Sequence, residues 1–318
     1  MHHTIAFYNV ENLYESDIYK NKLISKLPFQ GSRSWDISRY RNKLLKIAKT
    51  ISSIGVKETQ KLPTFFGLCE IENKKVIDEL LEKFPFKANY GYVHKDSLDE
   101  RGIDTAFFYN KEFLTIQESE FLRIPIFNND GTRDYTRDIT YTKGNLEGNM
   151  VHFFVLHLPS KRENNINVSK RIYILRELRK KLNEIFDKDA FANIIIMGDF
   201  NEDPTTTYLY QQLWNKKTVQ ELKERELYNP FENLYKNNVY STFHEGKGML
   251  FDQIIFSKSF FEEKNKLRYS SSNVFNAPYL QNTERGKLGT PWRTYSGSRY
   301  LGGYSDHFPV YAIIESIK

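Results

Sequence analysis

The sequence predicts an α/β fold, because short apolar runs alternate with amphipathic helical segments along the whole chain. The expected strands are runs of apolar, β-branched or aromatic residues. They fall at residues 5–9, 64–68, 103–109, 151–156, 194–197, 251–256 and 309–314. Several of these runs are almost continuously apolar, which is typical of strands buried on both faces. The pattern does not decide between one sheet and two.

Three segments have the spacing of amphipathic helices. The clearest begins after Asn167, where apolar residues recur at three- and four-residue steps and Arg and Lys fill the other face. Its apolar residues are Ile172, Leu175, Leu178, Leu182 and Ile185. A second helix is expected at about residues 38–54 and a third at about residues 74–84.

Three long stretches without such periodicity are expected to be surface loops: residues 15–36, residues 128–134 and much of residues 258–304. Loops of this length in a compact domain more often carry a function than none. The last stretch contains eight basic and three acidic residues, so it holds most of the net charge of +6. We find no repeat, low-complexity segment or linker, and therefore expect one domain over residues 1–318.

Composition excludes several classes of protein. Of the 318 residues, 40% are hydrophobic and 27% charged, unlike the composition of disordered or collagen-like chains. Cys69 is the only cysteine, so an internal disulfide and a Cys-rich zinc site are both excluded. No apolar run reaches the roughly 20 residues that cross a bilayer, and no signal peptide is visible. We expect a soluble, cytoplasmic monomer with a slight preference for anionic partners, or a secreted protein if a leader was removed.

Polar residues gather where the predicted strands begin or end. Asn9 and Glu11 close the first strand, and Glu70 closes the second. The later blocks are His157-Leu158-Pro159-Ser160, Gly198-Asp199-Phe200-Asn201, Phe251-Asp252-Gln253-Ile254 and Ser305-Asp306-His307-Phe308-Pro309. Carboxylates, amides and histidines that project from several strand ends are suited to a rigid active site.

Each block also has a purely structural interpretation. A carboxylate at a strand end, such as Glu70, is commonly a helix N-cap or a turn residue. A single histidine such as His157 is commonly a satisfied core or surface residue, and residues 198–201 have the composition of a turn. Ser305, Asp306 and His307 cannot form a serine-hydrolase triad among themselves, because adjacent side chains on an extended strand point to opposite faces.

Taken in chain order, the six blocks resemble the endonuclease/exonuclease/phosphatase superfamily. This group contains pancreatic-type DNases, apurinic endonucleases, inositol polyphosphate 5-phosphatases, neutral sphingomyelinases and deadenylases. The blocks are N-x-E, E, H-x-P-S, G-D-F-N, D-x-I and S-D-H, and they extend from Asn9 to Pro309. G-D-F-N and S-D-H-x-P are the most specific pieces. The resemblance implies a four-layer αββα sandwich, in which two mixed β-sheets pack face to face with helices outside.

The resemblance also implies a metal site. Glu70 would be the principal ligand, with Glu11 and Asp306 completing or neighbouring the site and Asn9 orienting these groups or contacting phosphate. Carboxylates and amides without thiolates are hard oxygen donors, which favours Mg²⁺ or Mn²⁺ over zinc. Family members often carry Asp where this chain has Glu11, and the extra methylene is a reason to consider a supporting role for that carboxylate.

Five further residues receive catalytic roles by the resemblance. Asp199 would orient or deprotonate the attacking water, and Asn201 would hold the water or a phosphoryl oxygen. His307 would be the catalytic histidine, and Asp252 would fix its tautomer and favour its protonated form. His157 would donate to a non-bridging oxygen or to the leaving group. Which group is the base and which the acid stays open.

Basic residues beside these blocks are candidates for phosphate binding, because a guanidinium matches two oxygens. They are Arg101, Arg137, Lys161, Arg162 and Arg171. For each one, the alternative is a solvated surface charge. In the basic loop, Pro291-Trp292-Arg293 and Tyr295 would hold a phosphodiester backbone and stack a base. The alternative is that these aromatic residues anchor the loop to the sandwich.

These observations predict a hydrolase that depends on a divalent metal and cleaves phosphodiesters, with DNA or RNA as the first choice of substrate. A phosphatase or lipid phosphodiesterase acting on inositol phosphates or sphingomyelin is the alternative within the same fold. The signature Trp-Cys-Asp-Arg of the inositol phosphatases is absent from the sequence. A non-catalytic nucleic-acid-binding module is a third possibility, but degenerate members of the family usually lack metal or histidine positions that this chain retains.

Overall fold

The computed structural model describes residues 1–16, 35–83, 89–128, 130–161 and 166–317. Most of the predicted loop at residues 15–36 therefore lies outside the described residues, as does Arg162. Within those ranges, no helix is both long enough and apolar enough to cross a membrane.

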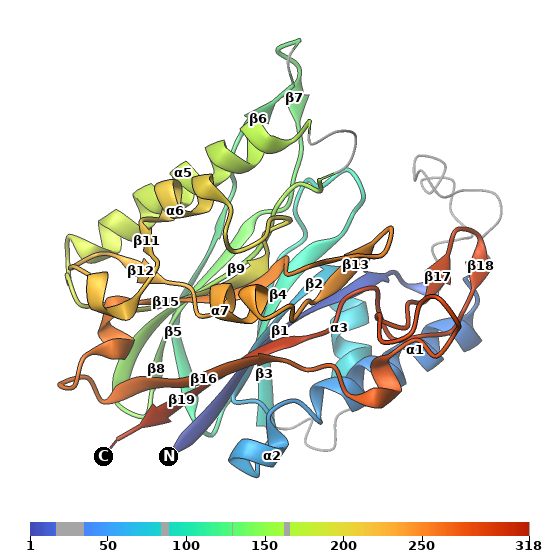
Figure 1. Cartoon of the computed structure of the whole chain (residues 1–318), viewed down its shortest axis with the longest axis horizontal. Helices are drawn as coiled ribbons and strands as arrows, with labels where there is room; N and C mark the ends of the chain where they lie inside the picture. Colours follow the sequence, from blue (N-terminus) through green and yellow to red (C-terminus); the bar gives the residue numbers. More distant parts are fainter. Residues whose placement is uncertain (17–34, 84–88, 129, 162–165, 318) are drawn as a thin grey trace.

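Two large mixed sheets form the centre of the fold (Figure 1). The six-stranded sheet has the order β16-β19-β1-β2-β4-β3, and only its β1–β2 pair is parallel. Its strands are β1 (His2–Leu13), β2 (Phe65–Ile71), β3 (Tyr90–His94), β4 (Asp104–Asn110), β16 (Leu267–Val274) and β19 (Val310–Ser316).

The seven-stranded sheet has the order β11-β12-β15-β10-β9-β8-β5, with parallel pairs at β9–β10 and β11–β12. Its strands are β5 (Leu114–Leu122), β8 (Ile139–Leu146), β9 (Asn149–His157), β10 (Asn193–Asp199), β11 (Asn215–Lys216), β12 (Leu227–Tyr228) and β15 (Asp252–Ser257). Three short hairpins complete the strands: β6–β7 (Ile126–Phe127, Arg133–Asp134), β13–β14 (Thr242–His244, Lys247–Met249) and β17–β18 (Tyr295–Ser296, Arg299–Tyr300).

Alternate residues of the central strands face two different cores. Ile5 and Phe7 of β1 pack into the core between the sheets, together with Ile195 and Met197 of β10. The intervening residues of β1 and β10 face the outer layers instead. Both faces of these strands are therefore buried, which is why their sequences are almost continuously apolar.

Helices cover the outer face of each sheet. The helices α1 (Ile37–Ile51) and α3 (Lys74–Leu81) pack on the six-stranded sheet, and α5 (Val168–Phe186) and α6 (Thr207–Leu213) pack on the seven-stranded one. The remaining helices are short: α2 (Val56–Thr59), α7 (Phe231–Lys236) and the 3₁₀ turns η4 (Val219–Glu221), η5 (Lys258–Phe261) and η6 (Pro278–Leu280). This arrangement of helix, sheet, sheet and helix confirms the predicted four-layer sandwich.

The segment 258–304 differs from its prediction as mostly loop. It contains β16, an eight-residue edge strand that pairs with β19 alone. The sequence of β16, Leu-Arg-Tyr-Ser-Ser-Ser-Asn-Val, is polar in its middle, where the edge strand is exposed. Its apolar core contacts come from Leu267, Tyr269 and Val274, which are too widely and unevenly spaced to give the alternation that predicts a strand. The last two residues of the predicted loop at 128–134, Arg133 and Asp134, form the strand β7, so that loop prediction was also only partly right.

Candidate active site

The ends of β1 and β2 depart from regular strand geometry. The register of the β1–β2 pair shifts between Asn9 and Leu13, and that of β2–β4 shifts between Cys69 and Ile71. Glu11, Asn12 and Glu70 lie inside these shifts, and all have left-handed backbone, with φ of 52°, 50° and 66°. Left-handed backbone is uncommon for non-glycine residues and tends to cluster at functional sites. The irregularities redirect these side chains relative to the pleat of the sheet.

On the facing sheet, three chemically active side chains come from neighbouring strands in register. Asp199 of β10 pairs with His157 of β9 on one side and with Asp252 of β15 on the other. The residue before Asp199 must be glycine, because a Cβ at Gly198 would lie 2.3 Å from the backbone oxygen of Leu156. The sequence block that starts with Gly198 therefore reflects tight strand packing at the site.

Asn9 joins the two sheets at this edge. Its side-chain amide donates to Oδ2 of Asp199 at 3.1 Å and lies 3.4 Å from Oε1 of Glu70. Nε2 of His157 lies 3.6 Å from the same Asp199 oxygen and 3.9 Å from Glu70. All four side chains are buried. The structure thus brings Asn9, Glu70, His157 and Asp199 together from four strands.

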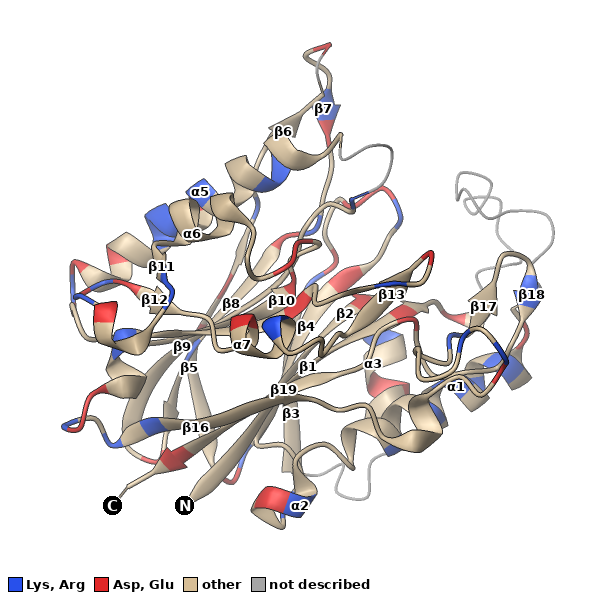
Figure 2. Ribbon diagram, viewed as in Figure 1, with Lys and Arg blue, Asp and Glu red and all other residues tan. Residues whose placement is uncertain are grey.

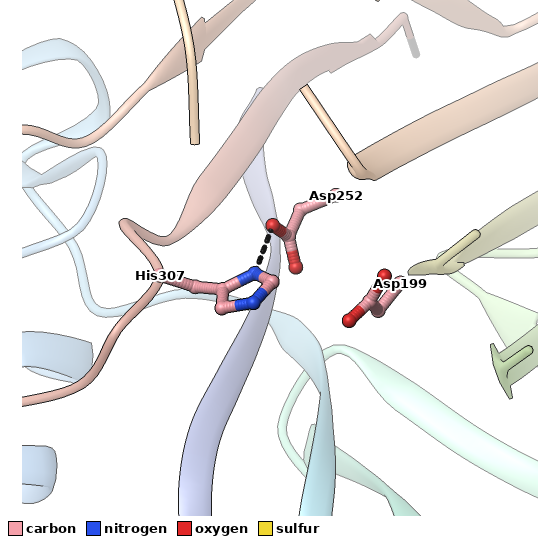
Figure 3. A group of neighbouring side chains, drawn as sticks. All are labelled: Asp199, Asp252 and His307. Carbon is pink, nitrogen blue, oxygen red and sulfur yellow. Dashed lines mark hydrogen bonds and ion pairs between the residues drawn. The ribbon is translucent and has the colours of Figure 1, made fainter. Parts of the chain in front are cut away.

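His307 and Asp252 form a hydrogen-bonded pair beside Asp199 (Figure 3). Nδ1 of His307 lies 2.6 Å from Oδ2 of Asp252, and the hydroxyl of Ser241 donates to the same oxygen at 2.6 Å. The other ring nitrogen of His307 faces the side of the cluster on which Asp199 lies. The ligand atoms of these three side chains lie within 4.8 Å of one another.

Two serines fix this histidine and its surroundings. The hydroxyl of Ser305 donates to the backbone oxygen of Asn9 at 2.6 Å and accepts the backbone N–H of His307 at 3.2 Å. Sequence reasoning considered Ser305 only as a nucleophile and missed Ser241 entirely. No motif surrounds Ser241, and it reaches Asp252 only through the fold.

Burial and neighbouring charges separate the pKa values of Asp199 and His307. Burial and the nearby charge of Asp252 raise the pKa of Asp199 to about 7. Burial lowers the pKa of His307, but the charge and hydrogen bond of Asp252 outweigh it and raise that pKa to about 10. Burial, assisted by the charge of Arg137, holds the pKa of His157 well below its usual value. Near neutral pH, the site therefore has one protonated and one neutral histidine beside a carboxyl group poised to exchange a proton.

The Glu70 carboxylate, at the C-terminal end of β2, is ionised. Burial raises its pKa, but nearby positive charge outweighs burial and lowers it, with Arg101 the largest contribution and Arg137 a smaller one. Oε2 of Glu70 accepts the backbone N–H of Asn12 at 2.8 Å and lies 3.7 Å from Nη2 of Arg101, which also contacts the Asn12 side chain. Arg137 is close enough to act on Glu70 and His157, and its guanidinium pairs with Asp99 at 3.1 Å.

Glu11, predicted to complete or neighbour the metal site, is occupied by other contacts. Its carboxylate accepts the backbone N–H groups of Thr294 and Tyr295 at 2.6 and 3.3 Å. It also lies 3.8 Å from Nζ of Lys43, a fully buried lysine of α1 that donates to the backbone oxygen of Tyr304. Glu11 thus anchors the segment that leads into the last site block, in keeping with a supporting role.

Asp306 faces the same region from the last block. Nη2 of Arg293 donates to its Oδ2 at 2.9 Å, and the hydroxyl of Thr242 donates to its backbone oxygen at 2.8 Å. Burial raises the pKa of Asp306, but the charges of His307 and Arg293 outweigh it and lower that pKa. Asp306 is therefore a second ionised carboxylate close enough to act electrostatically on Glu70.

Comparison of the sequence with protein families identifies the fold family. A model described as Endonuclease/Exonuclease/phosphatase family matches residues 4–316. The chain belongs to this family. The resemblance inferred from the six blocks is confirmed, and a comparison with curated protein sequences finds no match.

Solved structures of the endonuclease/exonuclease/phosphatase family align along the whole chain. A humanized D. rerio TDP2 with 14 mutations is 15% identical, with 99% of each chain covered and a TM-score of 0.59. A mannosyl-6-phosphatase of Bacteroides thetaiotaomicron is 18% identical, with 98% of this chain and 99% of that chain covered and a TM-score of 0.58. The human Nocturnin catalytic domain with bound sulfate is 14% identical, with 99% of this chain and 93% of that chain covered and a TM-score of 0.58. At these identities the likeness shows the fold.

The acidic groups of the site fit a hard divalent cation. Burial alone raises the pKa of Glu70 and of Asp306, and several carboxylates here act on one another as like charges. A bound cation relieves such repulsion, and the carboxylate oxygens of the site are the donors that Mg²⁺ and Mn²⁺ prefer. The geometry also groups Asp199, Asp252 and His307. We regard that group as a hydrogen-bonded unit and not as the metal site, because the Nδ1 proton shared with Asp252 is incompatible with metal ligation by that nitrogen.

The remaining predicted residues lie at the edge of the cluster or away from it. The Asn201 amide donates to the backbone oxygen of Leu158 at 3.0 Å, and its N–H donates to Asp199 at 2.8 Å, so this residue holds the turn after β10. Lys161 and Arg171 both pair with Glu202 at 2.7 Å. Arg171 lies on the buried face of α5 and is fully buried, so its guanidinium pairs with Glu202 and does not lie with the cluster, contrary to the expectation that it binds phosphate.

Proposed function

We propose that this protein is a divalent-metal-dependent hydrolase that cleaves phosphodiester bonds in nucleic acid. The observation that carries the proposal is the position of the Asp252–His307 pair beside Asp199, with Asn9 linking Asp199 to Glu70. A water activator, a proton donor and an ionised carboxylate for a metal are the parts that phosphoester hydrolysis needs.

The pKa values support a division of labour between two groups. Asp199, with a pKa of about 7, is suited to accept a proton from the attacking water near neutral pH. His307, with a pKa of about 10, carries a proton that it would donate to the developing charge on phosphate or on the leaving oxygen. Asp252 keeps the imidazole oriented, while the neutral His157 and the cationic Arg101 would contact the remaining phosphoryl oxygens.

Glu70 and Asp306 are the groups we assign to the metal, since both are ionised and both lie at this edge of the sandwich. Bound Mg²⁺ or Mn²⁺ would offset the negative charge of the phosphate and stabilise the charge that develops in the transition state. Glu11 would position the segment before Asp306 through its contacts with Thr294 and Tyr295.

Nucleic acid is the proposed substrate for two reasons. D. rerio TDP2, which shares the fold, has been solved in complex with a single-strand DNA product. The loop of residues 282–301, beside the site, also holds four basic residues and one acidic residue, as expected for a surface that meets a chain of phosphates (Figure 2). We further propose that residues 1–318 act as one catalytic domain and as a monomer.

A substrate screen with Mg²⁺ or Mn²⁺ tests this proposal. Plasmid DNA, single-stranded DNA, RNA, bis-p-nitrophenyl phosphate, inositol phosphates and sphingomyelin would be compared, with EDTA as the control. We expect cleavage of nucleic acid and of bis-p-nitrophenyl phosphate, both abolished by EDTA. Release of free phosphate from monoesters alone would instead favour a phosphatase.

A further inference from the structure

A small cleft of ≈ 290 Å³ opens beside the candidate active site. One wall is the turn between β13 and β14, and the other is the loop that runs from Asn282 to Leu301. Asp306, which we assign to the metal, forms part of its lining. The volume is just below the range of ligand pockets, about 300–1,000 Å³, so the cleft suits a single small group.

The wall formed by the loop is held in shape by its own backbone. The N–H of Asn282 donates to the oxygen of Thr290 at 2.7 Å, and that of Trp292 donates to Leu280 at 2.7 Å. The N–H of Tyr304 returns to the oxygen of Trp292 at 2.6 Å. These bonds close the loop on itself and on η6, so the cleft exists without a ligand and its walls are preorganised.

The lining combines charged groups with apolar surface. Lys287 and Arg293 bring positive charge, and Glu245 and Asp306 bring negative charge. Asp306 is paired with Arg293 and the Glu245 side chain is 87% exposed to solvent, which leaves Lys287 as the cation available to a ligand. Phe243 and Leu301 supply the apolar part. Glu284 lies 3.8 Å from Lys287 and is also paired with Arg299 at 2.8 Å. One carboxylate is therefore shared between two cations, and Lys287 can still attract another anion. A small ligand with an anionic group and an apolar body fits this lining.

The cleft and the reaction centre share a wall. Arg293 lines the cleft and donates to Asp306, and Asp306 precedes His307 in the chain. The strand residue Thr242 bridges to His307 and donates to the backbone of Asp306. A ligand bound in the cleft would therefore lie directly beside a phosphate that reacts at His307.

We propose that this cleft binds the nucleotide next to the scissile phosphate. Lys287 would contact its phosphate, and its sugar or base would lie against Phe243. This inference rests on the proposed function and makes it more specific, because it requires a substrate that continues beyond the bond being cut. Lys287 is the residue that distinguishes such a substrate from a simple ester.

The test compares Lys287→Ala with Lys180→Ala. Lys180 is a matched control because it is also an exposed lysine paired with a glutamate three residues earlier, but it lies on α5. Each variant would be assayed on labelled single-stranded DNA and RNA oligonucleotides of one sequence and on bis-p-nitrophenyl phosphate. We expect Lys287→Ala to lower kcat/KM on an oligonucleotide about five- to tenfold and to leave bis-p-nitrophenyl phosphate unchanged.

Binding provides a second readout that does not depend on turnover. Fluorescence anisotropy in EDTA should show weaker oligonucleotide binding by Lys287→Ala, and the slope of log Kd against log salt should fall by about one. An equal loss on both substrates, or no loss on the oligonucleotides, would overturn the assignment of the cleft. If the wild type cleaves none of the substrates, the proposed function fails, and the anisotropy result alone decides whether the cleft binds nucleotides.

Discussion

The side-chain amide of Asn9 donates to the carboxylate of Asp199 at 3.1 Å and so connects the two sheets of the sandwich at the candidate active site. The same amide lies 3.4 Å from Glu70. One residue of β1 thus sets the distance between the carboxylate assigned to the metal and the carboxylate assigned to water activation.

Asn9→Ala should lower kcat about 10- to 100-fold, because Asp199 and Glu70 lose the donor that orients both of them. The matched control is Asn193→Ala at the other end of β10, where the amide donates to the backbone oxygen of Met150. That change should affect stability but not kcat. Steady-state kinetics with both variants checks the prediction, and equal kcat values would contradict it.

Asp252 and His307 should behave as one catalytic unit, because they share a hydrogen bond of 2.6 Å in a buried site. Asp252→Asn combined with His307→Ala should therefore cost little more activity than His307→Ala alone. The kcat/KM values of the two single variants and the double variant test this coupling. Losses that simply multiply would show that the two side chains act independently.

Asp252→Asn should also move the titration of His307. The charge of Asp252 is the largest contribution that raises this pKa, and burial opposes it. Without that charge, the imidazole should lose its proton at a lower pH than in the wild type. NMR of the ring would show the shift, and an unchanged titration would argue against the pairing.

Much of the fold follows from apolar periodicity. Residues 5–9 and 194–197 could be predicted as strands because both of their faces are buried, so every position except Asn9 carries an apolar or aromatic side chain. The edge strand β16 could not be predicted, because its middle faces solvent and its order comes from pairing with β19.

Part of the candidate site could also be predicted from the sequence, because its residues lie at the ends of predicted strands. Asp199, Asp252 and His157 end or begin neighbouring strands, so a motif at a strand end places them together. The burial of Arg171 and Lys43 could not be predicted from a motif, but the spacing of these residues in their helices indicates it. Arg171 stands four residues before Leu175, and Lys43 four before Ile47, so both lie on the apolar faces of their helices and are buried.

Lys43 and Glu11 form a buried charged pair that should be coupled in stability. Lys43→Met should cost at most about 3–5 kcal/mol, because it removes the cation beside Glu11. The cost should be smaller below neutral pH, because burial raises the pKa of Glu11 to about 7 and the carboxyl group can take up a proton instead. The double variant Lys43→Met, Glu11→Gln should cost less than the sum of the two single changes. Urea denaturation at neutral pH measures these values. Additive free energies of unfolding would contradict a direct interaction.

His152 should make stability decrease in acid. Burial lowers its pKa from the ordinary value of 6.5 to about 4 in the folded protein. As pH falls from about 6.5 to about 4, the unfolded chain takes up a proton that the folded chain does not, so the unfolded state is favoured. The slope is at most about 1.4 kcal/mol per pH unit.

His152→Gln removes this group, and the difference in unfolding free energy between wild type and variant isolates its contribution. As the pH falls from about 6.5 to about 4, the unfolding free energy of the wild type should decrease relative to that of the variant. Above about pH 6.5 the difference should stay constant. Urea denaturation from pH 4 to 8 measures it. A difference that does not change with pH would show that the imidazole titrates alike in the folded and unfolded states.

The most direct test of the central claim is the metal dependence of hydrolysis in Glu70→Gln. Because Glu70 is the ionised carboxylate assigned to the metal, the variant should lose at least about 100-fold in kcat/KM on bis-p-nitrophenyl phosphate at saturating Mg²⁺. Its midpoint of unfolding should stay close to that of the wild type, whose activity should vanish in EDTA. Wild-type rates from Glu70→Gln at saturating Mg²⁺, or hydrolysis by the wild type in EDTA, would contradict the account.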